Sequence, residues 1–99
     1  MTKTKITPYD IVDYLITPED YAAYLDACIA ESQGDPAFIA KAIGDIARAK
    51  GMGDLARETG MGRESLYKAL SGERNPEFGI ILKVLKALGL ELHTTVAAS

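Results

Sequence analysis

The stretch "LARETGMGRESLYKALSGERNP", from Leu55 to Pro76, has the pattern of two short helices joined by a tight turn. The two helices are predicted at about residues 53–59 and 63–70, with a glycine near the end of each. Gly60, which lies between them, can adopt the left-handed backbone conformation that redirects a chain sharply. Two short helices held at a steep angle by such a turn form a helix-turn-helix.

The side chains of this unit divide into an inner and an outer set. Leu55 and Ala56 are expected to face the core, and Met61 and Leu66 to bury the inner side of the second helix. The outer set suits a DNA major groove, where Arg pairs with guanine, Glu accepts from the cytosine amino group, and Tyr and Lys reach phosphates or a thymine methyl group. We therefore predict DNA contacts by Arg63, Glu64, Ser65, Tyr67, Lys68, Ser71 and Arg74. The alternative is an exposed helix whose charges only solvate a face of a bundle.

Charge is unevenly distributed along the 99 residues, whose net charge is −3. Between Tyr9 and Ala40 there is no Lys or Arg, but there are seven acidic residues: Asp10, Asp13, Glu19, Asp20, Asp26, Glu31 and Asp35. From Gly51 to Ser99, six basic residues balance six acidic ones. The acidic excess therefore lies outside the predicted helix-turn-helix. It indicates either a solvated face or a docking surface for a basic partner.

Two Thr-Pro-X-Asp sequences mark helix starts in the acidic half. The one at Thr7 predicts a short turn or helix through Leu15, and the one at Thr17 predicts a helix over residues 18–32. The apolar positions of the second helix follow the spacing of one buried stripe: Tyr21, Tyr24, Leu25, Cys28 and Ile29.

Two more helix starts combine a capping residue with proline. Asp35–Pro36 predicts a helix that ends near Lys50, and Gly44 inside it indicates close helix packing, since glycine weakens a helix. Asn75–Pro76 predicts the start of a last helix, which Gly89 ends.

The residues from Leu90 to Val96 alternate between apolar and polar types, which predicts a strand. A lone strand must pair with the N-terminal segment, a second copy or a partner protein. The predicted fold is all-α: a compact bundle of about five helices that contains the helix-turn-helix, with a short C-terminal β-strand. Its expected parts are an acidic helical extension (1–34), the helix-turn-helix domain (35–90) and a C-terminal strand and tail (91–99).

Several functional classes are not expected. A composition of 47% hydrophobic and 25% charged residues is typical of a soluble globular protein. The chain has no apolar run near the ~20 residues of a membrane span, and its N-terminus does not resemble a signal peptide, so a cytoplasmic location is expected. With one Cys, one His, no metal-ligand spacing and no phosphate-binding glycine loop, we expect no catalytic residues, metal, cofactor or enzymatic activity.

Residues from about 51 to 89 resemble the Cro/repressor-type helix-turn-helix, through Leu55–Ala56, Gly60–Gly62, Ser71–Gly72, Asn75–Pro76 and "LKALGL" at 85–90. Most of the chain is similar to the addiction-module antidote family, in the order and spacing of "EDYAAYLDACIAE", "DPAFIAKAIGDIARAKGM", "LARETGMGRESLYKALSGERNPEF" and "LKVLKALGLEL". The resemblance implies a type II antitoxin that neutralises a RelE/ParE-like toxin by direct binding and represses its own operon by binding operator DNA.

A basic toxin would give the acidic segment a partner, because opposite charge speeds encounter and restricts the choice of partner. Tyrosine is also enriched at interfaces. We therefore predict toxin contacts by Tyr9, Asp10, Asp13, Tyr14 and Asp20.

Operator binding is expected to require a homodimer. Between Met52 and Pro76 the charges of four basic and four acidic residues cancel, so one copy attracts phosphate weakly. Two copies on adjacent half-sites would add their contacts. The alternatives are a helix-turn-helix interaction module that does not bind DNA, and a stand-alone transcriptional regulator.

Overall fold

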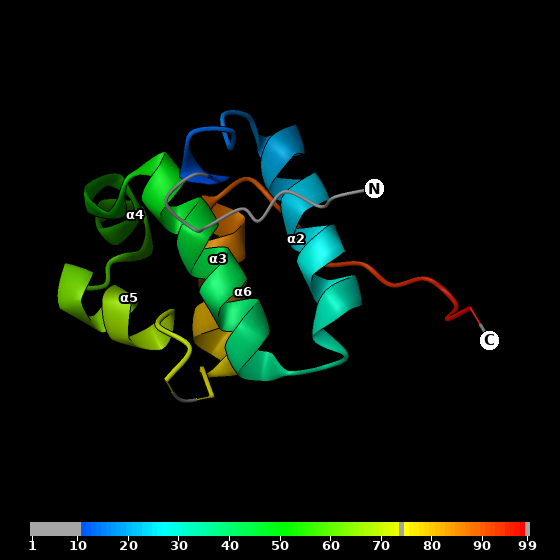
Figure 1. The fold of residues 1–99 in the computed structure, drawn as a ribbon. Coiled ribbons are helices and arrows are strands. Elements are labelled where there is room, and N and C mark those ends of the chain that lie inside the picture. Colours follow the sequence, from blue (N-terminus) through cyan, green and yellow to red (C-terminus); the bar gives the residue numbers. More distant parts are fainter. Residues whose placement is uncertain (1–10, 74, 99) are drawn as a thin grey trace.

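The computed structural model describes residues 11–73 and 75–98. Within them five helices are complete: α2 (Pro18–Ser32), α3 (Pro36–Lys50), α4 (Met52–Thr59), α5 (Arg63–Ala69) and α6 (Phe78–Ala87). Figure 1 shows α3 in the middle of the fold, with α2 on one side and with α4 and α5 on the other. No helix of the described ranges combines the length and the apolar character that a bilayer crossing requires.

One hydrophobic core joins all five helices. Ile43 and Ile46 of α3 are at its centre, and both are almost fully buried. Around them pack apolar side chains of the other helices: Tyr21, Leu25, Met52, Leu55, Leu66, Val84 and Leu85. Because α2 contributes to this core together with Leu15, the acidic helix is packed against α3, on the side away from α4 and α5.

The predicted bounds of α2 and α3 are confirmed, and the start of α2 has the expected capping box. Thr17 Oγ1 accepts a hydrogen bond from the Asp20 backbone N–H at 3.1 Å. In return, Asp20 Oδ2 accepts from the backbone N–H groups of Thr17 and Ile16, each at 3.0 Å. These bonds satisfy N–H groups that have no partner inside the helix.

The predicted start of the last helix is wrong. Asn75 and Pro76 are not helical, and α6 begins at Phe78 with Glu77 as its N-cap. Residues 75–77 instead connect the end of the helix-turn-helix to the point where the apolar face of α6 meets the core. That face is formed by Val84 and Leu85, together with Leu88 just beyond the helix.

The predicted C-terminal strand is also wrong. Residues 90–98 form no strand, and none occurs elsewhere in residues 11–73 and 75–98. The alternating pattern buries no face, because Leu92 and Val96 are 52% and 97% exposed. A strand is stable only with a paired neighbour, and Ile11 to Tyr14 at the other end of the described chain form helix and turn. The all-α class is supported, without the strand.

The prediction of close packing at Gly44 is confirmed. A Cβ atom added there would lie 2.7 Å from the Leu70 carbonyl oxygen and 3.3 Å from Leu70 Cβ. Leu70 directly follows α5, so this contact fixes how near the end of α5 approaches α3. Only a residue without a side chain allows the two backbones to lie this close.

Gly44→Ala should therefore lower the free energy of unfolding by about 1–3 kcal/mol, because the steric conflict exceeds the gain in helix propensity of about 1 kcal/mol. Urea unfolding followed by circular dichroism measures the change. Gly79→Ala is the matched control, since a Cβ atom at Gly79 meets no atom within 4 Å. A Gly44→Ala protein as stable as the control would contradict the account of this contact.

Asp20→Ala tests the capping box through pH. Hydrogen bonds from the Thr17 and Ile16 backbone lower the pKa of Asp20 below its ordinary value of 3.8. The unfolded chain therefore takes up this proton first as the pH falls, and the stabilisation by Asp20 is complete above pH 3.8 and is lost below it. At pH 6 the thermal unfolding midpoint of Asp20→Ala should lie below that of wild type. The difference between the two midpoints should close as the pH falls through the lowered pKa of Asp20. A difference independent of pH would contradict this explanation.

Candidate nucleic-acid interface

The turn between α4 and α5 has the predicted backbone. Gly60 has a φ of 74°, in the left-handed region. Thr59 makes a contribution that was not predicted from the sequence. Its buried hydroxyl donates to the Leu55 carbonyl at 2.8 Å and accepts from the Met61 backbone N–H at 3.3 Å. Thr59 thus ties the end of α4 to the turn, and the two helices have little freedom to change their angle.

The inner side of this unit is confirmed. Leu55 and Leu66 are fully buried, and Ala56 and Met61 are half-buried against the same core. Leu66 is the buried residue of α5. Ala69 is partly buried against the same core, and the remaining side chains of α5 are exposed.

Five of the predicted DNA-contacting residues lie on the exposed side of α5: Arg63, Glu64, Ser65, Tyr67 and Lys68. Tyr67 is 46% exposed. Ser71 lies just beyond the helix and is half-buried; its hydroxyl donates to the Lys68 carbonyl at 3.1 Å and accepts from the Glu73 N–H at 3.1 Å. Arg74 lies outside the described residues.

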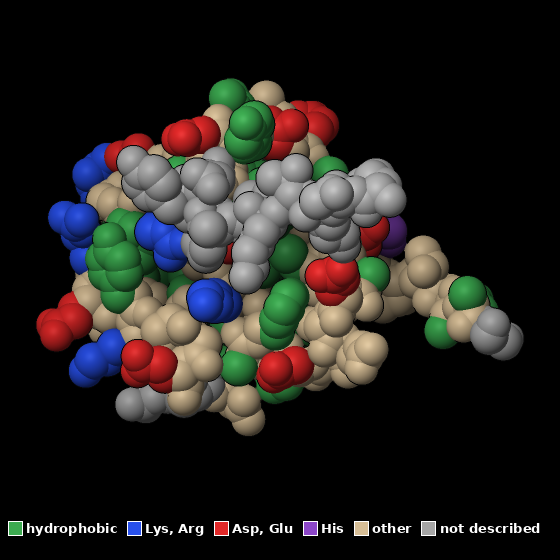
Figure 2. Space-filling view, in the orientation of Figure 1, with side chains coloured by type: hydrophobic (Ala, Val, Ile, Leu, Met, Phe, Trp, Pro, Cys, Tyr) green, Lys and Arg blue, Asp and Glu red, His purple; other side chains and the backbone are tan. Residues whose placement is uncertain are grey.

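Basic side chains gather on the same side of the molecule. In Figure 2 the visible Lys and Arg side chains lie over the half formed by α3, α4 and α5, and none is visible over α2. Arg57 forms an ion pair with Asp54 of its own helix, and Lys50 Nζ lies 3.8 Å from Glu58 Oε2. Arg63 and Lys68 form no ion pair with any residue of the described ranges, so their charges are available to a ligand.

Arg48 of α3 is a further candidate that the sequence analysis did not identify. It lines a small cleft together with Tyr67, Ser71 and Gly44, at the junction of α3 and α5. Its guanidinium pairs with Asp45 one turn earlier, and 41% of its side chain is exposed. The Asp-X-X-Arg spacing on a predicted helix would have indicated this pair.

Asp45 is almost fully buried, yet both of its carboxylate oxygens have partners. Oδ1 accepts from Arg48, and Oδ2 accepts from the Tyr24 hydroxyl of α2 at 2.6 Å. Burial, and then the hydrogen bond to Asp45, raise the pKa of Tyr24 well above its ordinary value. Tyr24 therefore keeps its proton and holds Asp45, and Asp45 holds Arg48 at the edge of α5.

The residues predicted to contact a toxin lie elsewhere. Asp13 and Tyr14 are exposed in the turn that precedes α2, and Tyr14 is 71% exposed. Asp20, half-buried, caps α2 as described above. Tyr9 and Asp10 are outside the described residues. Since α2 and α5 lie on opposite sides of α3 in Figure 1, Asp20 does not form one site with the predicted DNA-contacting residues of α5.

Comparison with known proteins places the chain in a family. Residues 5–96 match a family model described as "Probable addiction module antidote protein". The chain is also similar to an uncharacterized protein of Haemophilus influenzae, with 41% identity over 89 residues that cover 90% of each chain. No solved structure matches it. Because the family model spans nearly the whole chain, this protein belongs to the family of probable addiction module antidote proteins.

Proposed function

We propose that this chain is the antitoxin of a type II toxin-antitoxin module, that it neutralises a RelE/ParE-like toxin by direct binding, and that it represses its own operon by binding operator DNA as a homodimer in the cytoplasm. Membership in the antidote family implies a toxin partner in general. In this proposal the protein acts by binding and catalyses no reaction.

The observation that supports DNA binding best is the exposed side of α5. A short helix can enter a major groove only if its outer side is free and its inner side is anchored, and Leu66 provides that anchor. Arg63 in the first turn and Lys68 in the last are exposed on this helix. Arg48 would add a phosphate contact from α3. Met52, at the start of α4, is buried and apolar and can supply no such contact.

The homodimer follows from the size and charge of this surface. At about 1.5 Å per residue, the seven residues of α5 span roughly 10 Å, enough for a few base pairs. Glu64 in the first turn repels phosphate unless it accepts from a cytosine. One copy would therefore bind weakly, and two copies on half-sites about 34 Å apart would bind selectively.

Removing the two basic residues of α5 tests operator binding. The double variant Arg63→Ala plus Lys68→Ala should bind the DNA upstream of its own gene at least about 30-fold more weakly, because each contact contributes about 1–3 kcal/mol. Its affinity should also fall less steeply with salt, since fewer counterions are released. Fluorescence anisotropy at several salt concentrations measures both.

The charge-matched control is Lys83→Ala plus Lys86→Ala on α6, which removes the same charge from another helix. It should bind the upstream DNA within about threefold of wild type, because only the long-range attraction changes. Equal losses in the two double variants would indicate nonspecific binding and contradict the proposal. No specific binding by wild type would favour an interaction module that does not bind DNA.

Substitutions in the exposed turn before α2 test toxin binding. Deleting the N-terminal helices would remove Leu15, Tyr21 and Leu25 from the core, so surface substitutions are the better experiment. Asp13→Lys plus Tyr14→Ser should abolish rescue of cells that express the protein encoded beside this gene, with the thermal unfolding midpoint unchanged. Glu77→Lys, an exposed charge reversal at the start of α6, should rescue as well as wild type. Full rescue by the double variant would remove this turn from the toxin surface.

A further inference from the structure

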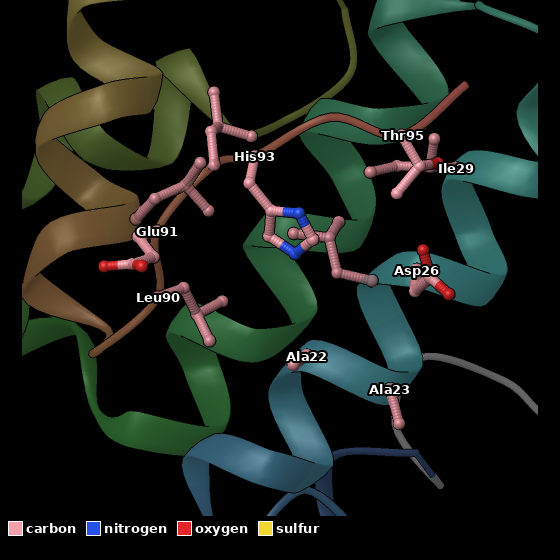
Figure 3. Close-up of a pocket in the computed structure, with 11 residues that line it drawn as sticks. Ala22, Ala23, Asp26, Ile29, Leu90, Glu91, His93 and Thr95 are labelled. Atoms are coloured by element: carbon pink, nitrogen blue, oxygen red, sulfur yellow. The ribbon is translucent and has the colours of Figure 1, made fainter. Parts of the chain in front are cut away.

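A groove lies between α2 and the C-terminal segment that follows α6. Its volume is about 560 Å³. Ala22, Ala23 and Ile29 of α2 form one wall, and Leu90, Leu92 and Thr95 form the other. Figure 3 shows the two walls, with the His93 ring directed into the space between them.

The walls of this groove include apolar side chains that are incompletely covered. Ile29 belongs to the stripe predicted to be buried, but 42% of it is exposed. Leu92 on the opposite wall is 52% exposed. The segment beyond Leu90 forms no strand, and it does not close over α2. Two large aliphatic side chains therefore remain available to a partner.

The charges at the groove have one sign. Asp26 of α2 and Glu91 of the C-terminal segment both line it, and no Lys or Arg lines it among the described residues. The charged residues of α2 itself are all acidic: Glu19, Asp20, Asp26 and Glu31. A ligand that fits here combines apolar side chains with positive charge.

We propose that this groove is the docking site for a segment of the toxin, in which apolar side chains contact Ile29 and Leu92 and neighbouring Lys or Arg side chains pair with Asp26 and Glu91. This inference rests on the proposed antitoxin function and specifies where and how the partner binds. Burial of the apolar side chains supplies affinity, and the acidic residues speed association with a basic partner.

The charge pattern also distinguishes this partner from other occupants. A second copy related by a two-fold axis would place the acidic rim of one groove against that of the other, and like charges at an interface oppose binding. Nucleic acid would be repelled by the same carboxylates. A basic protein segment meets neither obstacle.

The test uses the full chain and, as the probe, the purified protein encoded by the reading frame next to its gene. Ile29→Arg and Asp26→Lys should each weaken binding to this probe at least tenfold in calorimetry. Leu82→Arg is the matched control, because Leu82 is also 42% exposed but lies on α6 outside the groove. The affinity of Leu82→Arg for the probe should be within twofold of that of wild type. All three variants should keep the wild-type unfolding midpoint and the wild-type affinity for upstream DNA.

Each other outcome decides a different point. If wild type binds the probe and both groove variants bind as well as Leu82→Arg, the docking site is wrong while the antitoxin function stands. If wild type does not bind the probe, the proposed function itself fails. If Ile29→Arg halves the mass in sedimentation equilibrium, a second copy occupies the groove, and the docking proposal is overturned.

Discussion

The position of α5 depends on the close approach of two backbones at Gly44 and Leu70. With no side chain at Gly44, the end of α5 packs directly on α3, and Leu66 fills the core beneath it. The hydroxyl of Thr59 fixes the other end of the unit through the turn. These contacts hold the exposed face of α5 in one orientation, which a major-groove contact requires because a small misplacement loses directional hydrogen bonds.

The same central helix connects the two faces on which the proposed functions depend. Tyr24 of α2 donates to Asp45 of α3, and Asp45 pairs with Arg48 at the edge of α5. Buried polar groups of this kind are stable only when every member has a partner. The acidic helix is therefore joined to α3 both by the shared apolar core and by this connected set of polar contacts, which ends at Arg48 beside α5.

Local signals in the sequence predicted the helices well, because proline, capping residues and glycine act within a few residues of their position. Thr17–Pro18 and Asp35–Pro36 gave correct helix starts. Asn75–Pro76 predicted too early a start for α6, and the other errors concern tertiary context. Alternation at Leu90–Val96 cannot reveal that no strand is present to pair with, and the periodicity of α2 cannot show that Ile29 borders a groove. The outer side of α5 was predictable from its spacing, whereas the contribution of Arg48 required the packing of α3 against α5.

The central claim is that DNA and toxin bind opposite faces of one rigid fold. Amide chemical shifts of the isotope-labelled chain, recorded with upstream DNA and then with the protein encoded by the neighbouring gene, test it most directly. The account predicts that DNA shifts the amides of Arg63 to Ser71 and leaves those of α2 unchanged, while the second protein shifts the amides of the turn before α2, of α2 itself and of residues 90–95. Shifts from both ligands that coincide on either face would contradict it.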